Sequence, residues 1–191
     1  MTLPIFTKTA FEGQQLVLRG FSAEDVVKVV DYWHSATPEF LDGMGADPAK
    51  LSTREATTNK FRTAVHGTVP RTHVGMTAEL DGRFVAYSNA YIDDAGVAYP
   101  HVHVLDPTLR SRGVISLLFK HALDVYFKHF ELPKLMLLTS PGNVGINTLL
   151  QKFGLQPRTE HIEKPSGMAR PGAFLVYELT PQSWEKAHVA G

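Results

Sequence analysis

Residues 101–155 read HVHVLDPTLRSRGVISLLFKHALDVYFKHFELPKLMLLTSPGNVGINTLLQKFGL, and this stretch decides the fold. Residues 101–105 are typical of a strand, and the almost wholly apolar run that follows Gly113 predicts a long helix buried on most sides, which Pro133 ends. Residues 135–139 form a continuous apolar run typical of a central strand, and residues 144–153 predict a second helix that ends at Gly154. The stretch therefore predicts strand, turn, helix, strand and helix in that order.

The turn before the long helix carries two arginines and a glycine, in the sequence Arg110-Ser111-Arg112-Gly113. A helix N-terminus presents unpaired backbone N–H groups and about half a positive charge, and it therefore binds anions such as phosphate. The sequence thus predicts a phosphate site where the strand gives way to the helix.

The composition indicates a single globular domain spanning residues 1–191. Its 43% hydrophobic and 20% charged residues suit one core, and 19 basic against 19 acidic side chains exclude a global field for nucleic acid or an anionic membrane. The absence of cysteine excludes a disulfide framework, a thiolate zinc site and a cysteine nucleophile. Because no signal-peptide pattern and no membrane-length apolar run occurs, we expect a cytoplasmic protein.

The rest of the chain predicts an α+β order. A Ser cap with acidic residues opens a helix over residues 22–35, and Asp81-Gly82 is a strong hairpin signal. With the strand at 135–139, the expected strands number about seven. The other expected elements are a helix at 52–65 and strands at 16–21, 73–80, 83–92, 97–105, 158–163 and 173–179.

Two short motifs follow a known pattern. Arg110-x-x-Gly113-x-Ile115 fits Arg/Gln-x-x-Gly-x-Gly/Ala except at Ile115, and residues 143–155 line up with Asn-x-x-Ala-x-x-Leu-Tyr-Glu-Lys-x-Gly-Phe. In this order, the motifs resemble the GNAT (GCN5-related N-acetyltransferase) superfamily, as a bacterial-type member of unassigned substrate. The resemblance implies an α+β GNAT (acyl-CoA N-acyltransferase) fold, with a mixed central sheet of about seven strands flanked by helices. It also implies an acetyltransferase that uses acetyl-CoA as co-substrate.

The resemblance further implies that backbone groups hold the coenzyme, with the pantetheine arm along the strand and the pyrophosphate at the turn. The β-branched side chain of Ile115 either weakens this binding or points into the core, and Asn143 contacts the arm or caps the following helix, or does both. The implied coenzyme-binding residues are Val104, Leu105, Arg110, Ser111, Arg112, Gly113, Val114, Ile115 and Asn143.

Tyr99, His101 and His103 alternate onto one face of their strand. His101 stands nine residues before Arg110, where arylalkylamine N-acetyltransferases have a paired histidine, and the resemblance therefore implies a general base. An imidazole with a pKa near 6.5 predicts a rate that rises between about pH 6 and 8. Hydrogen-bonded core residues are the alternative for both histidines, and a metal site is not expected because no third ligand stands nearby.

The usual general acid of the family, a tyrosine four residues before the glycine of the second motif, is Leu150 here. Ser140, Tyr177 or water would have to protonate the departing thiolate. General acid–base help contributes about 3–5 kcal/mol, whereas holding the reactants in line contributes about 7–11 kcal/mol, so the missing tyrosine does not exclude activity. The candidate catalytic residues are His101, His103 and Ser140.

We therefore expect direct acetyl transfer to a small amine in a ternary complex. A non-catalytic acyl-CoA-binding or regulatory module on the same fold is the alternative, and an unrelated ligand-binding domain is a third. Glu39, Asp42 and Asp47 either receive an amine or serve as caps, and Arg170 either holds a substrate carboxylate or lies in an exposed turn. We expect no nucleic-acid or membrane partner, and a homodimer stays open.

Overall fold

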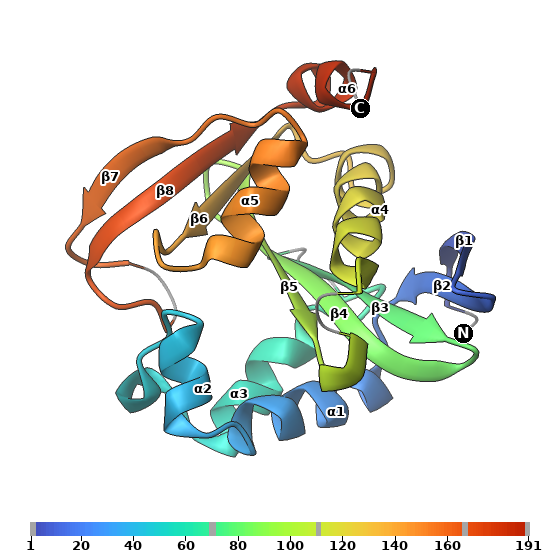
Figure 1. The fold of residues 1–191 in the computed structure, drawn as a ribbon. Helices are drawn as coiled ribbons and strands as arrows, with labels where there is room; N and C mark the ends of the chain where they lie inside the picture. Colours follow the sequence, from blue (N-terminus) through green and yellow to red (C-terminus); the bar gives the residue numbers. More distant parts are fainter. Residues whose placement is uncertain (1–2, 69–71, 110–111, 166–167, 190–191) are drawn as a thin grey trace.

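The computed structural model describes residues 3–68, 72–109, 112–165 and 168–189, which form one mixed eight-stranded sheet (Figure 1). Its strand order is β1-β2-β3-β4-β5-β6-β8-β7, and every neighbouring pair is antiparallel except β5 with β6. The strands are β1 (Ile5–Phe11), β2 (Gln14–Gly20), β3 (His73–Leu80), β4 (Arg83–Ile92), β5 (Val97–Val104), β6 (Lys134–Thr139), β7 (Arg158–Ile162) and β8 (Gly172–Leu179).

Helices lie on both sides of this sheet. α1 (Ala23–His34), α2 (Pro38–Gly43) and α3 (Arg54–Arg62) gather on one side, and α4 (Val114–Lys128) and α5 (Val144–Lys152) cover the other (Figure 1). α6 (Pro181–Val189) follows β8, and short 3₁₀ turns occur at η1 (Pro48–Lys50) and η2 (Pro107–Leu109). In the described part of the chain, no helix combines the length and the apolar character needed to cross a bilayer.

A buried ionic network fixes α1 against the sheet. Asp25 closes a capping box with Ser22 at the N-terminus of α1 and is itself completely buried. Its carboxylate accepts hydrogen bonds from Arg19 on β2, at 2.7 Å, and from the Thr77 hydroxyl on β3, at 2.9 Å. Arg19 also pairs with Glu79 at 2.7 Å. Because every member of this network has a partner, the buried charges are compensated and the helix is held in one position.

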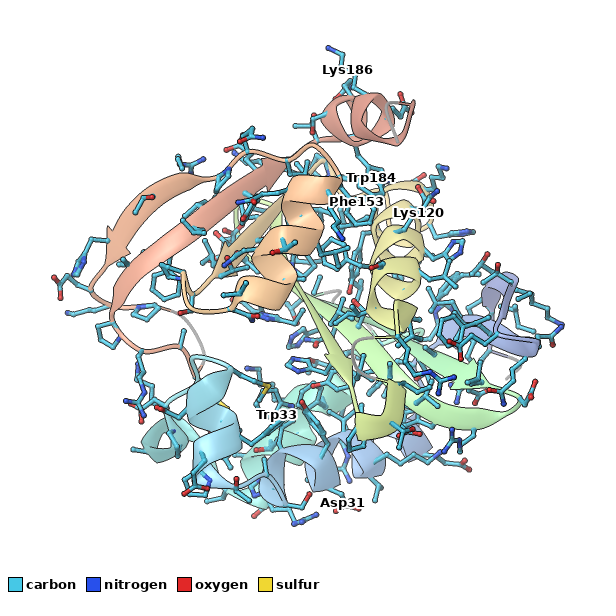
Figure 2. All side chains as sticks on the ribbon, in the orientation of Figure 1. Asp31, Trp33, Lys120, Phe153, Trp184 and Lys186 are labelled. Atoms are coloured by element: carbon cyan, nitrogen blue, oxygen red, sulfur yellow. The ribbon has the colours of Figure 1, made fainter. Side chains whose placement is uncertain are left out.

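α4 is the most buried helix, as its apolar sequence predicts. Tyr126 on its inner face is fully buried, and its hydroxyl lies 2.7 Å from the Ser88 hydroxyl on β4. Trp184 of α6 closes the far end of the core, where its indole N–H donates to Asp124 at 3.0 Å. Figure 2 shows Trp184 beside Phe153, and their ring centroids are 5.6 Å apart.

β5 and β6 part soon after they meet. Only Val97 with Lys134 and Ala98 with Leu135 are paired in this parallel ladder, whereas β5 stays paired with β4 as far as Val104. Pro100, two residues past the last pair, has no N–H to donate. The sheet therefore opens between these two strands, on the side that leads to the N-terminus of α4.

The α+β fold class and the mixed sheet predicted from the sequence are confirmed, but the sheet has eight strands rather than about seven. The additional strand is β1, which precedes the first strand expected from the sequence, at 16–21. Its hairpin turn uses Glu12 and Gly13 at φ values of 50° and 79°. Such hairpins are usually recognised by an Asn-Gly or Asp-Gly pair, and glutamate rarely adopts a positive φ. The sequence of this turn therefore gave no signal for a hairpin.

Candidate active site

A cavity of about 430 Å³ lies between the helices α1 and α3 and the parted strands. Six aromatic side chains line it, together with ionisable and small residues from both halves of the sheet. Its size is that of a typical small-molecule site. The aromatic lining residues are Trp33, Phe61, Tyr87, Tyr91, Tyr99 and Phe174.

Tyr99, His101 and His103 all line this cavity, which confirms that they share one face of β5. His103 is packed among aromatic rings: its imidazole stacks on Tyr87 at 5.0 Å and meets Trp33 edge-on at the same distance. Figure 2 labels Trp33 on α1, and this side chain lines the cavity. His103 therefore belongs to the packed floor of the cavity.

His101 is instead exposed to the cavity. Among the described residues, none forms a hydrogen bond with its imidazole. Desolvation lowers the pKa of His101 to about 4, and the charge of Lys60 contributes to this shift. Desolvation lowers the pKa of the packed His103 to about 3, with a contribution from the charge of His101. Both rings are neutral at pH 7, so His101 can accept a proton from a group in the cavity.

A third histidine and a lysine complete this part of the wall. His73 on β3 is buried and its Nδ1 lies 3.0 Å from the Thr63 hydroxyl. Burial and the charge of Lys60 lower the pKa of His73 to about 4, with a smaller contribution from His101. Lys60, on α3, lines the same cavity. The positive charge of Lys60 therefore acts on two imidazoles at once.

Two loops far apart in the sequence close one side of the cavity together. Ala46 and Ala169 form an isolated antiparallel bridge, and the Lys50 ammonium donates to the Ala169 carbonyl at 2.7 Å. Met168 and Ala169, from the loop before β8, line the cavity. Arg170, from the same loop, pairs with Asp42 at 2.6 Å and is exposed. Neither of these two side chains lines the cavity.

The other two candidate carboxylates also lie elsewhere. The Asp47 carboxylate accepts the Ala49 N–H at 3.1 Å as the cap of η1, and Glu39 is exposed in the first turn of α2. Each therefore has the capping or solvent-exposed role that was the alternative to binding an amine.

Ser140 follows β6 and lines the cavity opposite the β5 histidines. Gly45 packs against it with a φ of 77°, and a side chain at this glycine would meet the Ser140 Cβ at 3.3 Å. The Ser140 backbone is held by buried Asn147, whose amide donates to its carbonyl at 2.9 Å. The serine hydroxyl accepts the Gly142 N–H at 3.3 Å, which leaves its own hydrogen available for donation.

Leu150 and Tyr177 do not take part in this cavity. Leu150 is fully buried in the core of the protein. Tyr177 is buried as well, and its hydroxyl donates to the Asn147 side chain at 3.2 Å. Of the proton donors considered from the sequence, Ser140 is the side chain that lies at the cavity.

The predicted phosphate turn is described only in part, because Arg110 and Ser111 lie outside the described residues. Gly113, at a φ of 83°, stands at the N-cap of α4 without a side-chain cap. Apart from its two chain neighbours, no atom of the described residues lies within 4 Å of the position a Cβ would take there. Arg112 is exposed and pairs with Glu12 of the β1–β2 turn. This uncapped, open helix start fits an anionic group.

The remaining residues implied for coenzyme binding have mixed positions. Val114 is buried and Ile115 packs against the core, which favours the inward-pointing alternative for this isoleucine. The Leu105 N–H donates to Val85 at 2.9 Å, so this group is not free for a ligand. Asn143 caps α5 through the Ile146 N–H at 3.5 Å.

Val104 is buried at the end of β5, beside the opening toward β6. This opening suits an extended chain that runs from the start of α4 to the cavity. Among the described residues, no group of three or more histidine, aspartate or glutamate side chains is arranged to hold a metal ion.

Comparison with known proteins agrees with this architecture. Residues 32–155 match the family model described as "Acetyltransferase (GNAT) family". A search of curated proteins finds no match. RimL, a ribosomal L7/L12 alpha-N-protein acetyltransferase in complex with coenzyme A, aligns with a TM-score of 0.71 at 10% identity, covering 94% of this chain and 99% of its own.

Two further solved structures share the fold. Aminoglycoside acetyltransferase AAC(6')-Ib in complex with coenzyme A aligns with a TM-score of 0.66 at 15% identity, covering 91% of this chain and 99% of its own. Spermidine N-acetyltransferase from Vibrio cholerae, in complex with CoA and spermine, gives 0.68 at 15% identity, covering 89% and 98%.

The fold and the cavity beside the parted strands define an N-acetyltransferase. Since the family model spans well over half of the sequence, the chain belongs to the GNAT acetyltransferase family.

Several cavity residues were not predicted as part of the site. Asn89 and Tyr91 alternate along β4, and Asn89 pairs with His101 across the ladder. The alternation and the short turn between β4 and β5 could have placed them on the cavity face. Lys60 and Trp33 carried no such signal, because their approach depends on how α3 and α1 pack on the sheet.

Proposed function

We propose that the protein transfers the acetyl group of acetyl-CoA directly to the amino group of a small acceptor bound in the cavity. The observation that carries this proposal is the position of His101, which is exposed to the cavity, neutral at pH 7 and next to the opening between β5 and β6.

The described residues fit the coenzyme at two places, the uncapped N-terminus of α4 and the open edge of β5. The α4 N-terminus and Arg112 would hold the pyrophosphate, and the strand edge near Val104 would hold the arm. When bound, acetyl-CoA supplies an activated thioester whose carbonyl carbon accepts the attacking amine.

The protein's own side chains would manage the protons. His101 accepts, directly or through water, the proton that the nitrogen of an already unprotonated amine loses as its bond to the carbonyl carbon forms. Ser140, across the cavity, donates its hydroxyl hydrogen toward the departing sulfur, or water does so. His103 holds the floor of the cavity by ring stacking and acts as a positioning residue.

The test is free-thiol release from acetyl-CoA with a panel of amines, together with calorimetric titration of acetyl-CoA. We expect turnover with at least one amine, and about a hundredfold lower kcat/KM in His101→Ala with acetyl-CoA affinity retained. His161→Ala is the matched control, because His161 is exposed on β7 and does not line the cavity. The absence of both turnover and acetyl-CoA binding would refute the proposal.

The core position of Leu150 favours one second candidate, a non-catalytic acyl-CoA-binding module, because the family's usual proton donor is replaced by an apolar core residue. Tight coenzyme binding without thiol release for any amine would support that candidate over the first.

A further inference from the structure

Apart from three tyrosines, the ionisable side chains of the cavity wall are all basic. Lys50, Lys60 and the three histidines line it, and no aspartate or glutamate does so among the described residues. The carboxylates on surrounding elements are engaged elsewhere, since Asp42 pairs with Arg170, Asp47 caps η1 and Asp93 accepts the Tyr99 hydroxyl at 3.2 Å. An acceptor therefore meets positive charge with no protein carboxylate to offset it.

The two lysines differ in what they can still bind. The Lys50 ammonium is directed at the Ala169 carbonyl, where it joins the two loops of the cavity wall. Lys60 has no ion-pair partner in the part of the chain that the structure describes. Lys60 is exposed on α3 and lines the same cavity as His101 and His73. Lys60 is thus a cation at the proposed reaction centre whose charge the described protein groups do not compensate.

We propose that the acceptor is an amine that also carries a carboxylate, and that Lys60 binds this carboxylate while the amine lies against His101. The inference rests on the proposed acetyl transfer and names its substrate class. Because His101 and Lys60 line the same cavity, one small molecule can present its amine to the first and its carboxylate to the second.

The same charge disfavours polycations. An acceptor with several ammonium groups would bring like charges next to Lys60, whereas a carboxylate gains a charge-assisted hydrogen bond from it. The aromatic lining accommodates an apolar body between these two polar ends. The cavity therefore selects for an anionic or zwitterionic amine over compounds such as spermidine.

The test compares acid and amide pairs of equal size. Thiol release from acetyl-CoA is measured with glycine, leucine and phenylalanine against their amides, with spermidine as the polycation, and rates are expressed per unprotonated amine. We expect at least one acid to exceed its amide about 10- to 100-fold in kcat/KM, the range for a hydrogen bond to a charged group. Lys60→Gln removes this preference, and Lys60→Glu reverses it.

Arg62→Gln is the matched control. Arg62 lies on the same helix, is exposed, and bonds to Asn59 at 3.1 Å without lining the cavity, so its variant keeps the wild-type preference. If amides or spermidine are the better acceptors in the wild type, the inference is wrong while the proposed acetyl transfer stands.

A binding measurement separates the inference from the activity. N-acetylleucine and N-acetylphenylalanine are titrated against their amides by calorimetry, with coenzyme A present. Tighter binding of the acids that Lys60→Gln abolishes supports the carboxylate site even if no amine is acetylated. Three results would overturn the inference: equal affinity of acids and amides, equal affinity of the wild type and Lys60→Gln for the acids, or no binding of any of the four compounds.

Discussion

We expect His103 to make the folded protein sensitive to acid, and the size of this effect follows from its surroundings. Its ring is stacked on Tyr87 and edge-on to Trp33, and burial together with the neighbouring His101 lowers its pKa to about 3. In the unfolded chain the imidazole has a pKa near 6.5. Between about pH 3 and pH 6.5 it is therefore protonated in the unfolded chain and neutral in the folded protein. The free energy of unfolding therefore has its full value above about pH 6.5 and decreases as the pH falls toward 3.

At pH 4.5 the pH is two units below the pKa of the imidazole in the unfolded chain, whereas the imidazole in the folded protein is still neutral. Each unit contributes about 1.4 kcal/mol, so His103 alone removes about 2 to 3 kcal/mol between pH 7.5 and pH 4.5. His103→Phe keeps an aromatic ring on Tyr87 and deletes the titrating group. Its loss of stability over this range should be smaller than that of the wild type by the same amount.

Urea unfolding at pH 7.5, 6 and 4.5 measures this difference, provided that the transitions are two-state. His161→Phe is the control, since His161 is exposed and should follow the wild type. Parallel pH profiles for the wild type and His103→Phe would show that the imidazole is not excluded from water, and would refute the packed position of His103 described above.

Three further results are expected. His101→Ala should keep the rise of rate between pH 6 and 8, which then comes from the acceptor amine, because His101 is already neutral there; loss of that rise in a pH–rate profile would contradict its lowered pKa. Asn147→Leu should cost about 2 to 4 kcal/mol in urea unfolding, since it strips the buried hydroxyls of Thr139 and Tyr177 of a shared acceptor; a cost below about 0.5 kcal/mol would contradict this. Ile115→Ala should lower stability by about 1 to 3 kcal/mol but change the acetyl-CoA dissociation constant less than twofold by calorimetry; a larger gain in affinity would place its side chain at the phosphates.

The structure therefore changes the pH range in which His101 is expected to titrate. An ordinary imidazole at position 101 predicted a rise between pH 6 and 8, whereas the desolvated ring beside Lys60 titrates near 4. A pKa depends on the distance to surrounding charges and on water access, and neither quantity can be obtained from strand alternation.

Local patterns predicted the elements on the proposed coenzyme side of the site. The apolar run of α4, the alternation of β5 and the glycine after α5 all act through near neighbours, so the bounds of these elements were predicted to within one or two residues, except at the start of β5 within the quoted stretch and at the end of α4. α2 was not predicted, because proline interrupts a helix everywhere except in its first turn. In the structure Pro38 occupies the first turn of α2 behind the Thr37 cap, a position that proline tolerates.

The acceptor side could not be predicted in the same way. Lys60 reaches the cavity only because α3 packs against α1 and over the sheet, and Ser140 meets Gly45 across about a hundred residues of sequence. Such contacts depend on tertiary packing rather than on any period in the chain.

The bridge between Ala46 and Ala169 has a consequence for synthesis of the protein. The proposed acceptor side of the cavity needs a loop from the first quarter of the chain and another from its last quarter. A nascent chain that has emerged only as far as β6 can form the start of α4 and the strand bearing His101, yet it still has an open acceptor side. Selectivity for the acceptor would therefore be acquired last, when β8 takes its place beside β6.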